Sequence, residues 1–195
     1  MFKLRRAAGP PSASGIADAG FRRIRRIGRF VAVLAVLLAL LWPLALAASW
    51  ADLDFVQGRL ATEFGVAGRP IDTSAQTRAL AFALSMLIVG PSMYGLVLIA
   101  RLFTAFARGV VFEEENALRL SRFALVLIVT SVAAPFARLA TSVLLTMDNA
   151  PEERVMALLI EGSDLVAFLA GWAILAFAAI FREAVRLAHE NRQFV

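Results

Sequence analysis

The sequence contains no cysteine and a single histidine, His189. The absence of thiols excludes disulfides, cysteine-ligated zinc, iron–sulfur clusters and thiol catalysis within this chain. A haem or a histidine-rich metal site needs more ligands than one histidine supplies, so we expect His189 to be a solvated helix residue. The signatures of a nucleophilic serine elbow, a P-loop and a dinucleotide-binding loop are also missing. We therefore predict no enzyme activity, no cofactor and no metal site.

Long polar regions are scarce as well, because hydrophobic residues make up 60% of the chain. Soluble domains are only about half apolar. Four apolar runs approach the roughly 20 residues that a helix needs to cross a bilayer, and none shows the alternation typical of transmembrane strands. The predicted fold class is all-α, a polytopic membrane protein with four transmembrane helices. Their approximate ranges are 30–50, 79–100, 123–145 and 160–181.

These spans leave only short loops, so we expect residues 21–195 to form a single four-helix transmembrane domain. Residues 1–20 have few large apolar side chains and several glycines, prolines and serines, a composition typical of disorder. The stretch 21–30 places apolar residues at helical spacing among arginines, which fits a helix along the inner headgroup layer that leads into the first span. A cleaved secretory signal is the less favoured interpretation of this region.

Arginine and lysine are distributed unevenly around the four spans. Fifteen of them lie in the N-terminal tail, the central loop and the C-terminal tail, and four lie in the two other loops. Because positive residues near span ends stay in the cytoplasm, both termini and the central loop are predicted to be cytoplasmic. The net charge of +5 then indicates contact with anionic membrane lipid and no direct binding of nucleic acid.

Features that shape the packing of helices lie within the apolar runs. Proline removes a backbone hydrogen bond, so kinks are predicted at Pro43, Pro91 and Pro135. Pro91 follows a glycine, and the carbonyls that this pair releases need neighbours or water. A local packing adjustment is the favoured interpretation there, ahead of a binding cavity. Ala167 and Gly171 have the small-xxx-small spacing that lets a neighbouring helix approach closely.

Arg138 is the one cation inside an apolar run. It lies about 16 residues beyond Arg122, or roughly 24 Å along the third helix. Asp164 lies about 18 residues before Arg182, or roughly 27 Å along the adjacent antiparallel helix. Since charges at such depth are costly and usually paired, Arg138 is predicted to pair with Asp164, or with Glu161 one turn outward. The alternative is that Arg138 extends to the outer headgroups.

Of the segments between spans, the polar stretch 101–123 has the clearest pattern of charged residues and turn residues. Glutamates at positions 113–115 complement the positive end of a helix dipole, so the third helix is predicted to begin near Glu113, inside the cytoplasm. Glu115 and Arg119 have the favourable four-residue spacing of a helical ion pair. Gly109 is expected to make the preceding turn. The fourth helix also continues past its apolar run into the cytoplasm.

Two short motifs lie in these cytoplasmic regions. The first consists of Phe106, Gly109, Phe112, Glu115 and Asn116. The second includes Phe181, Arg182, Leu187, Glu190 and Asn191. They resemble the signatures F-x-x-G-x-x-F-x-x-E-N and F-R-x-[AG]-x-x-L-x-x-E-N of a family of small four-span bacterial membrane proteins, the domain of unknown function 2975. The resemblance implies a bacterial inner membrane and no assigned chemistry. Some members are encoded beside helix-turn-helix regulators, which implies a cytoplasmic protein partner.

The leading hypothesis is a non-enzymatic membrane protein whose cytoplasmic collar, defined as residues 103–122 and 181–192, binds or regulates a protein partner. Its motivation is that apolar side chains lie among charges in both segments. The alternative is that the two segments only pair with each other, through Glu115 and either Arg182 or Arg186.

Two further hypotheses come from different functional classes. The prolines and Arg138 are compatible with a small transporter or channel built as a homo-oligomer. That hypothesis requires a water-filled path lined by Arg138, Tyr94 and Thr130. An accessory subunit of a larger membrane complex is the remaining alternative.

Overall fold

A computed structural model describes residues 13–193 of the chain. Within that range the structure is helical and contains no strand. The four long helices are α1 (Ala13–Ala51), α4 (Ala75–Ala107), α5 (Glu114–Thr146) and α6 (Gly162–Gln193). Each holds a stretch that is long and apolar enough to cross a membrane. The all-helical fold class and the four candidate spans are therefore confirmed, and the chain has the architecture of a multi-pass membrane protein.

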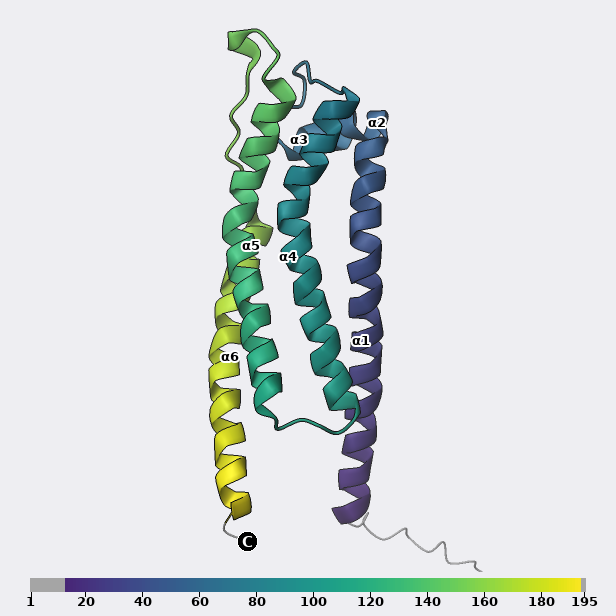
Figure 1. The fold of residues 1–195 in the computed structure, drawn as a ribbon, viewed down its shortest axis with the longest axis vertical. Coiled ribbons are helices and arrows are strands. Elements are labelled where there is room, and N and C mark those ends of the chain that lie inside the picture. The colour runs from purple at the N-terminus through teal and green to yellow at the C-terminus, as the bar shows by residue number, and fades with distance from the viewer. Residues whose placement is uncertain (1–12, 194–195) are drawn as a thin grey trace, which may run out of the picture.

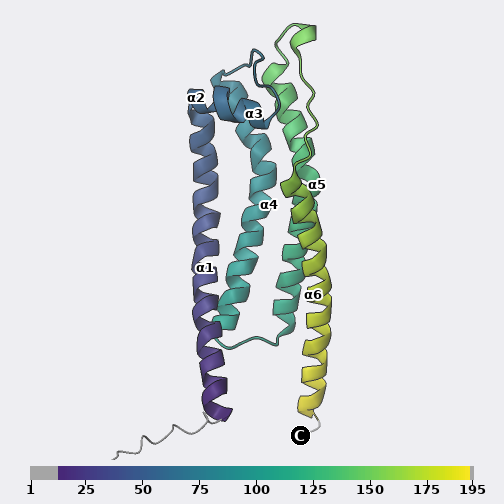
Figure 2. The ribbon, with the colours of Figure 1, turned by 180° about the vertical axis from the view of Figure 1, so that it is seen from behind.

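The four helices form a row in the order α1, α4, α5, α6, with contacts between successive members. Figures 1 and 2 show α1 and α6 at the two edges of this row. The described chain begins and finishes at one end, which also holds the loop between α4 and α5, and we name it the terminal end. The opposite, distal end holds the two longer connections.

Glycines allow the backbones to come close at both outer interfaces of the row. A Cβ atom on Gly28 of α1 would lie 2.9 Å from the Phe103 carbonyl oxygen of α4. A Cβ atom on Gly171 of α6 would lie 2.7 Å from the Ile128 side chain of α5. Larger residues would separate these helices, so the close packing predicted for Gly171 is confirmed.

The start of α1 differs from the prediction. Disorder was predicted through Gly20, whereas the helix begins at Ala13; residues 1–12 lie outside the described part of the chain. The arginine-rich stretch 21–30 continues the first span as one helix, so it does not turn along a headgroup layer. Extending an existing helix avoids the cost of nucleation, and the alanines before Gly20 have the highest helix propensity. All three prolines within the long helices lie in continuous helix, and the kinks stay a prediction.

The connection between α1 and α4 folds into a plug at the distal end. It contains the short pieces α2 (Leu53–Phe55), η1 (Val56–Leu60) and α3 (Ala61–Glu63). Its apolar side chains pack with the ends of the long helices. The buried cluster comprises Trp50, Val56, Leu60, Ala61, Phe64, Val66, Ala81 and Leu145. The plug therefore joins the distal ends of α1, α4 and α5.

Asp72 organises the start of α4. Ser74 is the N-cap, and its hydroxyl accepts a hydrogen bond from the Thr77 amide at 3.3 Å. The Asp72 carboxylate accepts hydrogen bonds from the Thr77 hydroxyl and from the Ser74 amide, the latter at 2.8 Å. These bonds, that from Thr77 foremost, lower the pKa of Asp72 below its usual value of 3.8. The Asp72 amide also donates to the Leu145 carbonyl at 2.9 Å, which ties this turn to α5.

Candidate functional site

The chain approaches α6 in an unexpected conformation. The fourth span was predicted to begin at about residue 160, and α6 begins close to it, at Gly162, after residues 154–161 in an extended conformation. This segment runs back from the distal end along α5 (Figure 1). Its side chains alternate, since Met156, Leu158 and Ile160 are exposed whereas residues between them are partly buried. The sequence did not reveal the extended segment, because apolar residues in an extended segment and in a buried helix have the same composition.

Three polar side chains on one face of α5 bind the backbone of the extended segment. The pairs are Thr146 Oγ1 with Val155 N (3.0 Å), Ser142 Oγ with Ala157 N (3.1 Å), and Arg138 Nε with Leu159 O (3.2 Å). Four helical residues rise about 6 Å, and two extended residues rise about 6.6 Å, so the two spacings match. Non-helical backbone at membrane depth needs such internal partners. We call these three pairs the backbone ladder.

Arg138 lies at the deep end of the backbone ladder and forms an ion pair there. Its Nη2 donates to Asp164 Oδ2, and its Nη1 lies 3.9 Å from Glu161 Oε1. The side chains of Arg138 and Asp164 are only 12% and 10% exposed. Asp164 also accepts a hydrogen bond from the Glu161 amide at 2.9 Å, which satisfies a free donor at the start of α6. The structure thus brings all three predicted residues together, and the Arg138 side chain contacts groups of this same chain.

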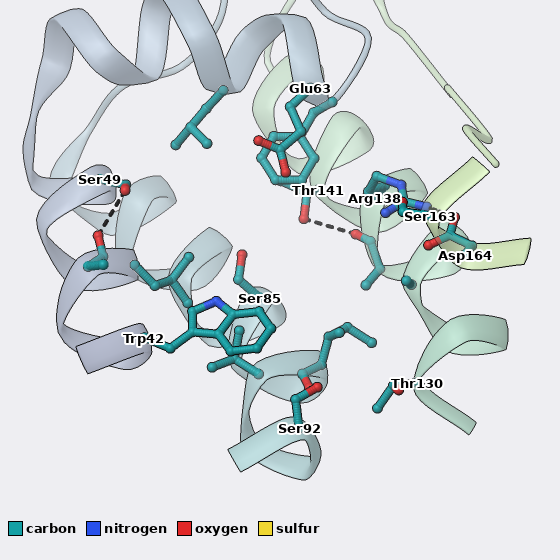
Figure 3. A pocket seen from close by; sticks show the side chains of 18 of the residues that line it. Trp42, Ser49, Glu63, Ser85, Ser92, Thr130, Arg138, Thr141, Ser163 and Asp164 are labelled. Carbon is teal, nitrogen blue, oxygen red and sulfur yellow. Dashed lines mark hydrogen bonds and ion pairs between the residues drawn. The ribbon is translucent and has the colours of Figure 1, made fainter. Parts of the chain in front are cut away.

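A cavity of about 590 Å³ lies next to this ion pair, bounded by α1, α4, α5, the plug and the start of α6. Figure 3 shows labelled side chains of α1, α3, α4, α5 and α6 around one space, with the Glu63 carboxylate pointing into it from α3. Aromatic side chains on its wall are Trp42, Trp50, Phe55 and Phe64. Hydroxyl-bearing residues on its wall are Ser49, Ser85, Ser92, Thr130, Ser131, Thr141 and Ser163. The charged residues on its wall are Glu63, Arg138 and Asp164.

The Gly-Pro pair in α4 lies next to residues of the cavity wall. Packing adjustment was favoured over a cavity at Pro91, yet Ser92 and neighbouring residues of that turn line the space. Of the path residues required by the transport hypothesis, Arg138 and Thr130 line the cavity and Tyr94 does not. Sequence reasoning missed the cavity because its walls come from segments far apart in the chain. The available signal was the set of hydroxyl residues inside the apolar runs.

The first motif builds the turn at the terminal end. Gly109 has a φ of 85°, a conformation that side chains disfavour, so the turn predicted there is confirmed. Asn116 is fully buried, and its amide donates to the carbonyls of Val110 and Val111 at 3.0 and 3.1 Å. Glu115 pairs with Arg119 at 2.5 Å, as predicted from their spacing. The turn is therefore fixed by a glycine conformation and a buried amide.

The two motifs meet through their aromatic residues. The rings of Phe112 and Phe181 stack with centroids 6.0 Å apart, while Phe106 packs edge-on against Phe103. Arg182 Nη2 donates to Ser121 Oγ at 3.2 Å, so α6 also contacts α5 next to this stack. Phe112 nevertheless stays 53% exposed.

The remaining residues of the second motif lie farther along α6. Glu190 lies 4.0 Å from Arg186, which also pairs with Glu183. Leu187 is 49% exposed. The side chains of Asn191 and His189 lie outside the described residues. Among residues 13–193, the ion pairs do not include the alternative pairing of Glu115 with an α6 arginine.

The family DUF2975, described as a protein of unknown function, matches residues 69–194. The chain belongs to the DUF2975 family. The resemblance drawn from the two motifs is thereby confirmed. Both motifs, the ion pair and the backbone ladder lie within the DUF2975 match, whereas α1 and most of the plug precede it. Neither a curated protein nor a solved structure matches the chain.

Proposed function

We propose that this chain is a non-enzymatic membrane protein of the bacterial inner membrane whose collar binds a protein partner in the cytoplasm. The proposed orientation rests on the uneven distribution of arginine, because fifteen basic residues belong to the terminal end or the tail leading to it and four to the distal end. The collar then faces the compartment in which soluble regulators reside.

The exposed Phe112 ring is the observation that carries this proposal. Phe112 stacks on Phe181 and still leaves 53% of its surface uncovered, and Leu118 and Leu187 of the collar are 40% and 49% exposed. Arginines and glutamates lie among these apolar residues along the sequence of both segments. Apolar surface rimmed by polar residues is typical of protein interaction sites.

The charged residues of the collar are also available to bind an external partner. Glu115 pairs with Arg119 in α5, and Arg186 pairs with Glu183 in α6, so both ion pairs stay within single helices. Between the two segments of the collar, the contacts are the stack of Phe112 on Phe181 and the hydrogen bond from Arg182 to Ser121. Exposed pairs within a helix contribute only about 0.3–0.5 kcal/mol each, so a partner can replace them at little cost.

Crosslinking in native membranes tests the proposal. A photoreactive amino acid at Leu187 reports neighbours of the collar, and the same group at Val129, in the middle of α5, is the control. Phe112→Asp should remove the protein captured from Leu187, whereas Phe112→Tyr, which keeps the ring, should retain it. An identical set of neighbours in wild type and Phe112→Asp, at equal membrane abundance, would contradict partner binding.

The cavity favours a small transporter or channel as the second candidate function. Its volume of about 590 Å³ and its wall of hydroxyl groups beside Arg138 and Thr130 are the features that a permeation path would use. An accessory subunit of a larger complex is the third candidate, and mild-detergent purification of the intact chain with its bound proteins separates it from both others.

A further inference from the structure

The hydroxyl groups on the cavity wall have no proton to offer an occupant. Six of the seven donate to a backbone carbonyl three or four residues earlier in their own helix. The seventh, Ser163, donates to Glu161 Oε2 at 3.0 Å. Figure 3 draws two of these bonds, including that of Thr141. Because a hydroxyl has one proton and two lone pairs, these oxygens are acceptors toward the cavity.

The formal charges on the wall have the same preference. The wall holds two carboxylates, those of Glu63 and Asp164, and one guanidinium, that of Arg138. Arg138 is already matched by Asp164, with Glu161 3.9 Å away on its other side. Among residues 13–193, no cation lies within ion-pair distance of Glu63. An anionic occupant would therefore meet no free positive charge, and a cationic occupant would meet an unpaired carboxylate.

The aromatic side chains add a third, independent preference. Trp42 of α1 borders the space, and Trp50 stacks on Phe64 with centroids 5.7 Å apart. The faces of aromatic rings attract cations, tryptophan most strongly. Rings and aliphatic side chains also provide an apolar surface for a hydrocarbon body. The cavity volume lies within the range of about 300–1,000 Å³ that is typical of small-molecule sites.

We propose that this cavity binds a hydrophobic ammonium, a molecule with an apolar body and a positively charged N–H donor. The ammonium group lies toward Glu63 and the acceptor oxygens, and the apolar body lies against the aromatic wall. This site is separate from the collar, so it stands whether or not the collar binds a protein.

A series of three probes with one hydrocarbon cage tests the charge preference. The full chain in lipid nanodiscs is titrated with 1-adamantylamine, 1-adamantanol and 1-adamantanecarboxylate, and binding is followed by tryptophan fluorescence. The amine should bind at least about tenfold more tightly than the alcohol, the size of one charge-assisted hydrogen bond. The carboxylate should bind most weakly. Equal affinity for all three probes would overturn the proposal.

Variants separate the site from partitioning of the probes into lipid. Glu63→Gln should abolish the preference for the amine over the alcohol, and Glu63→Asp, which keeps the charge, should retain it. Glu152→Gln is the matched control, because Glu152 is an exposed carboxylate at the distal end outside the cavity. A preference that is unchanged in Glu63→Gln would refute the assignment of the site.

Discussion

Replacing Asp164 by asparagine should destabilise the protein by about 3 kcal/mol, because it leaves a buried guanidinium with incomplete compensation. Arg138 and Asp164 are 12% and 10% exposed, so little water can replace the lost carboxylate. Glu161, 3.9 Å from Arg138 and 46% exposed, supplies part of the missing charge, which keeps the cost at the lower end of the usual range of about 3–5 kcal/mol. Asparagine can still accept the hydrogen bond from the Glu161 amide, so this variant isolates the charge.

The reverse substitution should cost more. Arg138→Met leaves the Asp164 carboxylate buried beside Glu161 and also removes the donor to the Leu159 carbonyl. We expect a loss near 5 kcal/mol. The double variant Arg138→Met with Asp164→Asn removes both charges and leaves only neutral groups without partners, so it should be more stable than Arg138→Met alone.

The measurement is a double-mutant cycle on unfolding in mild detergent, with membrane abundance as a second readout. A coupling free energy of about 2 kcal/mol or more is expected for residues in contact. Exchanging the charges, Arg138→Asp with Asp164→Arg, should restore only part of the stability, because an aspartate at position 138 cannot donate to the Leu159 carbonyl. Additive effects within about 0.5 kcal/mol would refute the view that the two residues act as a pair.

Three further predictions concern other parts of the chain. The pKa of Asp72 is lowered in the folded state, so its stabilisation is present above pH 3.8 and is lost as the pH falls below that value. Protection of the backbone amides at the start of α4 against hydrogen exchange should therefore fall below pH 3.8. Asp72→Asn should remove this pH dependence. Gly171→Leu should cost about 1–3 kcal/mol by overpacking against α5, whereas Gly90→Leu, with open space around its Cβ position, should cost less in the same thermal unfolding assay. Reporter fusions at Ala61 and Asn149 should both report the periplasmic side; a cytoplasmic signal from either would contradict the proposed orientation.

Part of the site could be predicted because residue counts along a single helix give the height of each side chain. Arg138 and Asp164 each sit a known number of residues from the arginines at the terminal end, and helical rise converts those counts into height. The turn at Gly109 could also be predicted, because it depends on local backbone chemistry. These features need no knowledge of how distant segments meet.

The extended segment and the cavity could not be predicted for the opposite reason. Residues 154–161 are extended because Ser142 and Thr146, on another element, bind their backbone. The cavity depends on α1 and the plug meeting α4 and α5, four segments whose mutual positions no local pattern encodes. The start of α1 at Ala13 was missed because local composition underestimates how far a stable helix continues.

The backbone ladder also sets the height of the last helix. Its rungs, the three side chains on α5, are four residues apart, and each binds the backbone of one residue of the extended segment 154–161. Moving the rungs by one step would slide α6 by about 6 Å along its axis. The charged end of α6, with Phe181 and Arg182, would then lose its register with Phe112 and Ser121. The hydroxyl groups of Ser142 and Thr146, toward the distal end of the row, thus determine how far α6 reaches at the terminal end.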